Sequence, residues 1–249
     1  MTDKKSKWQT DELVATFLQG VRGAIPAAGL QLEIINHIIQ SWCPRPRRIL
    51  DLGCGDGAIG RFLLEQNPET HVIFADFSDP MLEAARKQIG NDARTTIVKA
   101  DFSSKSWLES IDSQEPVDVV VSGFAIHHQS DQRKKELYKE VFNLLNEGGV
   151  FLNLEHVVSA TPNVESLFDD YFIGHLHRFH LTIDATKSRK EIAQVYYDRP
   201  DKEENMLASV QDQSEWLGNI GFSDVDCFFK VFELALFGGR KPGCQGAGS

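Results

Sequence analysis

Residues 48–60 read RILDLGCGDGAIG, and this stretch decides the fold. Its first five residues are mostly apolar, as in a buried strand. Glycines follow at 53, 55 and 57, and a helical pattern begins near Ala58. Glycine lets the backbone turn sharply and lets a ligand approach it closely. The stretch therefore predicts a strand, a ligand-binding turn and a helix, in that order.

Strands and helices alternate outward from this turn. Short apolar or alternating runs predict strands at 48–52, 71–76, 95–100, 117–122 and 149–155. Between them, runs with helical spacing predict helices at 58–66, 79–89, 104–111 and 131–145. Short strands separated by helices are typical of an α/β fold with a doubly wound, mostly parallel sheet.

The two flanks depart from this alternation. Helices are expected before the first strand, at 11–20 and 27–42, and residues 163–219 indicate a run of helices without a strand. Two further strands, 224–230 and 232–239, lie too close together for a helical crossover, so they must be antiparallel. We therefore expect a seven-stranded sheet with an antiparallel C-terminal strand.

This pattern divides one domain, 1–249, into five parts. They are N-terminal helices (1–45), a ligand-binding core (46–156), a helical cap (157–220), a closing β-hairpin (221–241) and a disordered tail (242–249).

Composition limits the class of protein. The chain has 249 residues and a net charge of −10, which argues against nonspecific binding to nucleic acid or to an anionic membrane. No apolar run is long enough for a transmembrane helix, and the N-terminus lacks the apolar core of a secretory signal. Four cysteines (43, 54, 227 and 244) match no zinc spacing. We expect a cytoplasmic protein with reduced thiols and no metal.

An acidic residue after the second strand indicates a nucleoside ligand. Asp76 closes that strand nineteen residues after Gly57, where a carboxylate accepts hydrogen bonds from ribose hydroxyls. Gly53, Gly55 and Ala58 also satisfy the dinucleotide pattern G-x-G-x-x-G/A. The ligand is therefore either a dinucleotide or another nucleoside.

Three features favour S-adenosylmethionine (SAM). Asp51, just before the glycine loop, would repel a pyrophosphate but can hold an ammonium group. Asp101 closes the third strand, where it can accept from an adenine amine. The antiparallel hairpin at the end of the chain is also foreign to the usual dehydrogenase sheet.

Six stretches then resemble the successive motifs of the class I SAM-dependent methyltransferases. They are ILDLGCGDGAIG, FADFSDPML, VKADFSS, VDVVVSGFAIHH, LNEGGVFLNLEHV and GFSDVDCFFKVFELALFGGRK, and the similarity covers about 45–155 and 215–241. The resemblance implies the strand order 3-2-1-4-5-7-6, with strand 7 antiparallel. It also implies that SAM lies over the carboxyl ends of strands 1, 2 and 4.

The resemblance implies a role for each cofactor-binding position. Those expected beside the methionine part are Asp51, Gly53, Cys54 and Gly55. Those expected around the adenosine are Asp76 at the ribose, Phe77 and Met81 against the adenine, Asp101 at its amine and Phe102 beside it. Ser122, Gly123 and Phe124 would lie near the sulfonium. The stretch FLQGVRGAIP resembles one in the branch that includes carboxy-SAM synthases, so Arg22 would reach the methionine carboxylate or else be a solvated arginine at a helix end.

Candidate catalytic residues follow strands 4 and 5. Methyl transfer to an oxygen or a protonated nitrogen needs the acceptor to be aligned and one proton to be removed. His127 and His128 are candidate bases, and Glu155 is a candidate contact to the acceptor. Each can instead be a packed residue. His175, His177 and His180 do not share a helix face, so they fit a pocket lining better than a metal site.

The sequence therefore predicts a SAM-dependent methyltransferase that methylates a small molecule at oxygen, nitrogen or carbon and releases S-adenosylhomocysteine (SAH). Two alternatives stay open, a carboxy-SAM synthase-like enzyme and a non-catalytic SAM-binding regulator. Arg199 is only a loose parallel to the cation that carboxy-SAM synthases use. Neither nucleic acid nor a membrane is an expected partner, and the chain is expected to be a monomer or a homodimer.

Overall fold

The computed structural model describes residues 7–10, 13–14, 22–111, 115–184 and 186–243. The helix expected at 11–20 and Cys244 thus fall wholly or largely outside the described residues. No helix in the described ranges is long and apolar enough to cross a membrane.

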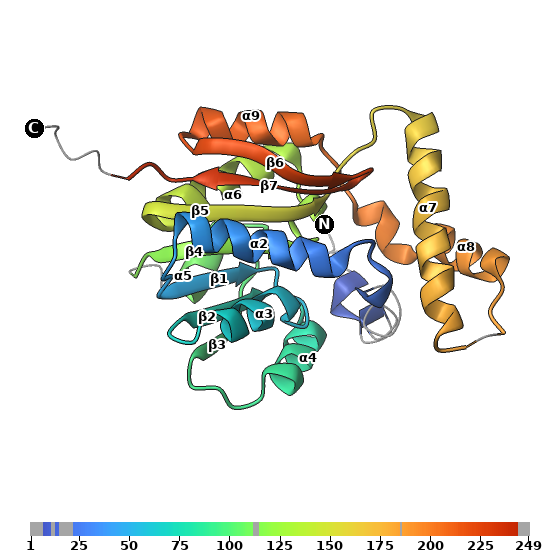
Figure 1. Ribbon diagram of the computed structural model, residues 1–249, viewed down its shortest axis with the longest axis horizontal. Coiled ribbons are helices and arrows are strands. Elements are labelled where there is room, and N and C mark those ends of the chain that lie inside the picture. Colours follow the sequence, from blue (N-terminus) through green and yellow to red (C-terminus); the bar gives the residue numbers. More distant parts are fainter. Residues whose placement is uncertain (1–6, 11–12, 15–21, 112–114, 185, 244–249) are drawn as a thin grey trace, which may run out of the picture.

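Seven strands form one sheet, in the order β3-β2-β1-β4-β5-β7-β6 (Figure 1). The strands are β1 (Arg48–Leu52), β2 (His71–Asp76), β3 (Thr95–Lys99), β4 (Val117–Gly123), β5 (Leu145–His156), β6 (Ser223–Val231) and β7 (Leu234–Arg240). β1 to β5 pair in parallel, whereas β7 is antiparallel to both β5 and β6. The predicted order and the antiparallel strand are confirmed.

Helices cover both faces of the sheet. On one face lie α2 (Ala28–Trp42), α3 (Ala58–Gln66) and α4 (Asp79–Ile89). On the other lie α5 (Trp107–Ser110), α6 (Asp131–Leu144) and α9 (Val210–Ile220). Side chains of successive strand residues point alternately to the two faces, because the strand is pleated. Ile49 packs with the first group of helices and Leu50 with the second.

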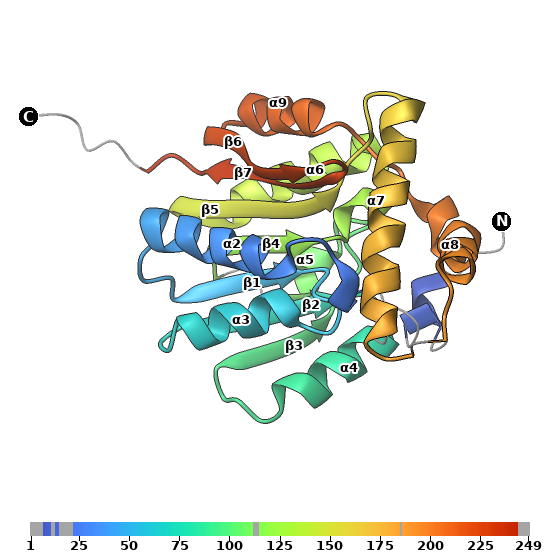
Figure 2. The same cartoon turned by 45° about the vertical axis from the view of Figure 1, so that its right-hand side comes forward.

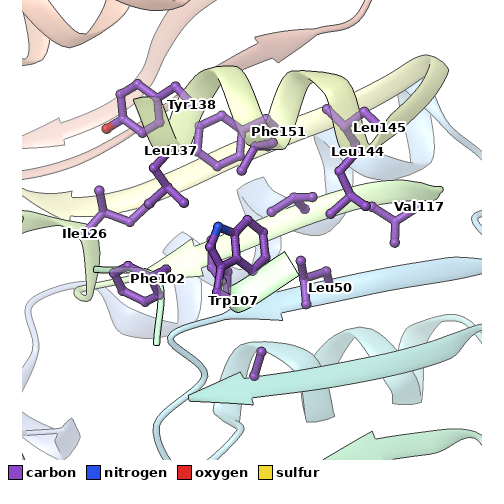
Figure 3. Packing of buried hydrophobic residues seen from close by; sticks show 14 of the residues in the cluster. Leu50, Phe102, Trp107, Val117, Ile126, Leu137, Tyr138, Leu144, Leu145 and Phe151 are labelled. Atoms are coloured by element: carbon purple, nitrogen blue, oxygen red, sulfur yellow. The ribbon is translucent and has the colours of Figure 1, made fainter. Parts of the chain in front are cut away.

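The core beneath α6 contains aromatic rings whose polar ends are paired (Figure 3). Trp107 is 1% exposed, and its Nε1 donates to Glu140 Oε2 at 2.7 Å. Tyr138 is fully buried and donates to Gln213 Oε1 of α9 at 2.6 Å. A buried Tyr or Trp needs such a partner. These contacts make this face of the sheet a rigid support for the site.

A separate group of helices stands beyond one end of the strands (Figures 1 and 2). It consists of α7 (Pro162–Leu181), α8 (Arg189–Asp198) and the 3-10 turn η5 (Pro200–Glu204), and we call it the cap. α7 packs against α8 and against η3 (Arg22–Ala24). The cap follows His156, at the carboxyl end of β5, so it begins where parallel α/β sheets collect ligands.

Three expected boundaries differ from the structure. The helix expected at 104–111 is only four residues long, because the residues before Trp107 form hydrogen-bonded turns instead. β5 begins at Leu145 instead of 149, and a shift in its pairing with β4 absorbs the extra residues. The expected cap range 157–220 also includes α9, which packs against α6, β6 and β7. α9 therefore belongs to the sheet layers.

Candidate active site

The glycine loop joins β1 to α3 in a conformation that favours glycine. Gly53, Gly55 and Gly57 have φ of 69°, 56° and 81°. A Cβ on Gly53 would lie 2.3 Å from Cβ of Ala125, so the segment after β4 packs directly on the loop. This close approach brings His127, two residues beyond Ala125, beside the loop.

Asp51 anchors the helix that follows the loop. It is 1% exposed, and its Oδ2 accepts from the backbone N–H of Gly60 at 2.8 Å. Gly60 is in the first turn of α3, whose N–H groups have no partner within the helix. Asp51 also lines the cavity described below, so it combines a structural contact with a place at the candidate site.

Asp76 links the glycine loop to α4. It is 6% exposed, with Oδ2 accepting from Gly55 N at 2.9 Å and Oδ1 from Ser78 N at 2.8 Å. Burial raises the pKa of this carboxyl, and the hydrogen bonds from Ser78 and Gly55 oppose that rise. The carboxylate is thus held in a fixed orientation at the end of β2.

A cavity of about 1150 Å³ opens over this edge of the sheet. Single small-molecule sites usually have volumes of roughly 300–1000 Å³, so this one has room for two ligands. Most of the expected cofactor-binding residues line it, namely Asp51, Gly53, Cys54, Gly55, Asp76, Phe77, Met81, Asp101, Phe102, Gly123 and Phe124. The cavity therefore brings together residues from the ends of β1, β2, β3 and β4.

The predicted position of Ser122 is wrong. Its side chain is 1% exposed, is not part of the cavity wall, and donates from Oγ to the carbonyl of Leu52 at 2.7 Å. The alternation of a strand explains this, since Gly123 faces the cavity and the residue before it faces the other way. Arg22 lies in η3, where the structure describes only its backbone.

His127 and Glu155 form a buried pair. His127 Nδ1 lies 2.6 Å from Glu155 Oε1, which also accepts from His156 N at 2.9 Å. Burial lowers the pKa of His127 well below its usual value and raises the pKa of Glu155 to about 7. Above that pH the imidazole is neutral and the carboxylate ionised, so Nδ1 carries the proton and Nε2 is a bare acceptor.

The free nitrogen of His127 is open to the cavity. Glu155 lies beneath the imidazole and is not in the cavity wall, whereas His127 is. Nε2 has no hydrogen-bond partner among the described residues and is not one of the fully enclosed unpaired atoms. The structure therefore places Glu155 against His127 and not in the cavity wall, where a direct contact with the acceptor was expected.

A second histidine–carboxylate pair lies beside the first. His156 Nε2 is 2.6 Å from Glu233 Oε2, and Glu233 is 4% exposed in the turn between β6 and β7. The rings of His127 and His156 are 5.8 Å apart, centre to centre, and nearly perpendicular. His156 also lines the cavity. The sequence did not indicate this pair, because no motif singles out Glu233 as a functional residue.

His128 stacks near His127, with ring centres 4.0 Å apart. Burial and the neighbouring His127 lower the pKa of His128 to about 4. Burial lowers the pKa of both histidines after β4, so the pKa does not separate them as bases. His127 differs from His128 in its contact with Glu155, which orients its ring.

The cap forms the opposite wall of the cavity with apolar side chains. Those that pack together and line it are Phe168, Phe172, Leu176, Ile192, Tyr196 and Leu234. His175, His177 and His180 do not converge: only His180 lines the cavity, and His177 Nε2 lies 3.2 Å from the carbonyl of Lys187. The described residues contain no group of three side chains suited to a metal ion.

The N-terminal segment at Lys7 and Trp8 also borders the cavity. The carbonyl of Trp8 accepts from Ser78 Oγ at 2.6 Å, and Lys7 N donates to Glu204 Oε1 of η5 at 2.9 Å. Lys7 and Trp8 both line the cavity. Residues from the start of the chain thus bridge α4 and the end of the cap.

Comparison with known proteins agrees with this geometry. A family model described as a methyltransferase domain matches residues 49–149. The carboxy-S-adenosyl-L-methionine synthase of Nautilia profundicola is 22% identical over 91% of each chain. A demethylmenaquinone methyltransferase of Leptospira interrogans is 32% identical, over 50% of this chain and 49% of its own.

Solved structures of methyltransferases have a similar fold. The structure of phosphoethanolamine N-methyltransferase 2 of Haemonchus contortus, in complex with S-adenosyl-L-methionine, matches with a TM-score of 0.62 and 16% identity. The match covers 97% of this chain and 61% of that one, so the chain spans about three fifths of that protein's length.

The domain match, these relatives and the shared fold together support a SAM-dependent enzyme similar to the class I methyltransferases. The carboxy-SAM synthases match the chain over nearly its whole length.

Proposed function

We propose that the chain transfers a methyl group from SAM to a small-molecule acceptor, with His127 as the general base. SAM would supply an electrophilic methyl on a sulfonium. Asp76 would bind the ribose, Asp101 the adenine amine, and Phe77, Met81 and Phe102 the adenine ring. The methionine part would lie along Gly53, Cys54 and Gly55, beside Asp51. The glycine loop supports this arrangement, because its backbone can be approached closely and the two acids flank it.

The observation that carries the proposal is the His127–Glu155 pair beside the glycine loop. Glu155 holds the proton on Nδ1, which leaves Nε2 free to take a proton from an acceptor. A histidine whose other nitrogen bonds a carboxylate is the usual arrangement of an oriented base.

A second candidate reaction is supported by the relatives. Carboxy-SAM synthases match this chain over about nine tenths of its length. If the chain made the same kind of product, His127 would have no proton to remove from an acceptor.

Mass spectrometry of the nucleoside that copurifies with the native protein separates the two reactions. We expect SAM or SAH. A species heavier than SAM by one carboxylate would contradict methyl transfer and support the synthase. Titration of the purified protein with SAH serves as the control for cofactor binding.

A further inference from the structure

The wall around His127 presents hydrogen-bond acceptors to the cavity. Glu155 accepts a hydrogen bond from Nδ1–H of His127, and Glu233 accepts one from Nε2–H of His156. When an imidazole is neutral, its remaining nitrogen is an acceptor. With both rings neutral, the two histidines offer two acceptor nitrogens, on rings whose centres are 5.8 Å apart.

Neither of these two nitrogens is already used. His156 Nδ1, like His127 Nε2, has no hydrogen-bond partner among the described residues and is not one of the fully enclosed unpaired atoms. Both histidines line the same cavity. A ligand placed between them must bring two donors, because two acceptors facing one another leave the site unsatisfied.

Two other buried hydrogen-bond acceptors nearby also lack a partner. Oε2 of Glu155 and Oδ1 of Asn205 are buried acceptors without a partner. Among the described residues, the cations that line the cavity are Lys7, Lys187 and Arg199. Asp201 lies 3.7 Å from Nε of Arg199, and Glu203 lies 3.3 Å from Nζ of Lys7. The same wall also carries Glu204, so its carboxylates offset its positive charges, which disfavours an anionic ligand.

One wall of the acceptor half is apolar. The six cap and hairpin residues that line it, from Phe168 to Leu234, form one hydrophobic cluster. His156 touches this cluster directly, with its ring centre 5.7 Å from that of Phe168. The two histidines therefore stand beside an apolar wall of the chamber.

Resting on the proposed function, we infer that the acceptor is an uncharged aromatic molecule with two neighbouring hydroxyl groups, held between His127 and His156. One hydroxyl loses its proton to Nε2 of His127 and its oxygen bonds to the methyl carbon. The electron pair of the broken carbon–sulfur bond stays on sulfur. The other hydroxyl donates to Nδ1 of His156. The pair His156–Glu233 thus determines specificity, and the apolar cap holds the ring.

Calorimetry at pH 8 with the SAH-loaded protein tests this inference without turnover. The probes are 2,3-dihydroxynaphthalene, 2-naphthol and 2-naphthoate, which share one ring system. We expect the diol to bind at least about tenfold more tightly than either other probe, since a hydrogen bond is worth about a factor of ten. Equal affinities, tighter binding of 2-naphthoate, or no binding of the diol would overturn the inference.

Variants assign the preference to one side chain. His156→Phe keeps a ring against Phe168 but removes the nitrogen, so it should bind the diol and 2-naphthol equally. Glu233→Gln no longer fixes the tautomer of His156. Its preference for the diol over 2-naphthol should fall at least about threefold, which is part of the tenfold effect of one hydrogen bond. The matched control is His175→Phe, because His175 lies on α7 outside the cavity wall and contacts Tyr171.

The control should keep the full preference, and a preference that survives in His156→Phe would refute the role of that residue. SAH titration separates the two proposals. If SAH does not bind, the proposed function fails and the inference fails with it. If SAH binds and the diol preference is absent, only the acceptor class is wrong.

Discussion

At the scale of single residues, we expect cofactor binding to depend most on the side chain of Asp76. Its carboxylate is fixed by Gly55 and Ser78 before any ligand arrives, so little ordering is needed on binding. Two charge-assisted hydrogen bonds to ribose, each worth about 1.5–3 kcal/mol, would depend on it. We expect Asp76→Ala to weaken SAH binding by at least about a hundredfold in calorimetry.

Asp101→Asn is the matched comparison. Asp101 is exposed, and the amide that replaces it keeps an oxygen for the adenine amine. We expect SAH affinity to fall about tenfold, which is the effect of one hydrogen bond, and the melting temperature to stay unchanged. Unchanged SAH affinity in Asp76→Ala would refute the assignment of the nucleoside half of the cavity.

Residue roles could be predicted from the sequence where a local motif carries them. The end of β2 predicted Asp76, and the segment after β4 predicted His127. Glu155 was placed on the acceptor side, although it lies beneath His127, because a strand pattern does not show which layer a residue occupies. His156 and Glu233 are 77 residues apart, and their contact depends on the turn between β6 and β7, so no local pattern indicates it.

At the scale of elements, the link between the cap and α9 connects the cap to the candidate base. Met206 N donates to the carbonyl of His127 at 2.8 Å, and Lys134 of α6 bonds the carbonyl of Met206. Val158 N donates to the carbonyl of Ala208 at 3.1 Å. Both ends of the cap are thus tied to the sheet layers, while α7 and α8 contact chiefly each other and the cavity.

We therefore expect ligands to order the cap more than the sheet. Segments with few contacts to the rest of a fold open most readily, and lids come from such segments. With SAH and 2,3-dihydroxynaphthalene, amide exchange in α7 and α8 should slow by at least about fivefold, whereas β1 and β4 should not change. SAH alone is the control. Equal exchange of α7 and α8 with and without both ligands would contradict a closing cap.

Element boundaries were predictable where spacing and capping agree, as in α3 and α4. The short α5, the early start of β5 and the placement of α9 were not, because each is set by tertiary contacts. α9 has a helical pattern like those of α7 and α8, and only its buried contacts with α6 and β7 place it on the sheet.

At the scale of the whole molecule, the glycine loop, the strand alternation and the closing hairpin predicted a doubly wound sheet with an antiparallel strand, and the resemblance to the methyltransferases implied its strand order. The acceptor could not be predicted in this way. Its chamber is built from β4, β5, the cap and the hairpin, which are separate in sequence and meet only in the folded chain. Composition, with its net charge of −10, says nothing about the polarity of that chamber.

A crystal structure of the complex with SAH tests the central claim most directly. The account predicts the adenosine between Asp76 and Asp101, the amino acid part along Gly53 and Gly55, and the sulfur on the side of the cavity that holds Nε2 of His127. An SAH molecule bound away from the glycine loop, or a sulfur on the side of the cavity opposite His127, would contradict it.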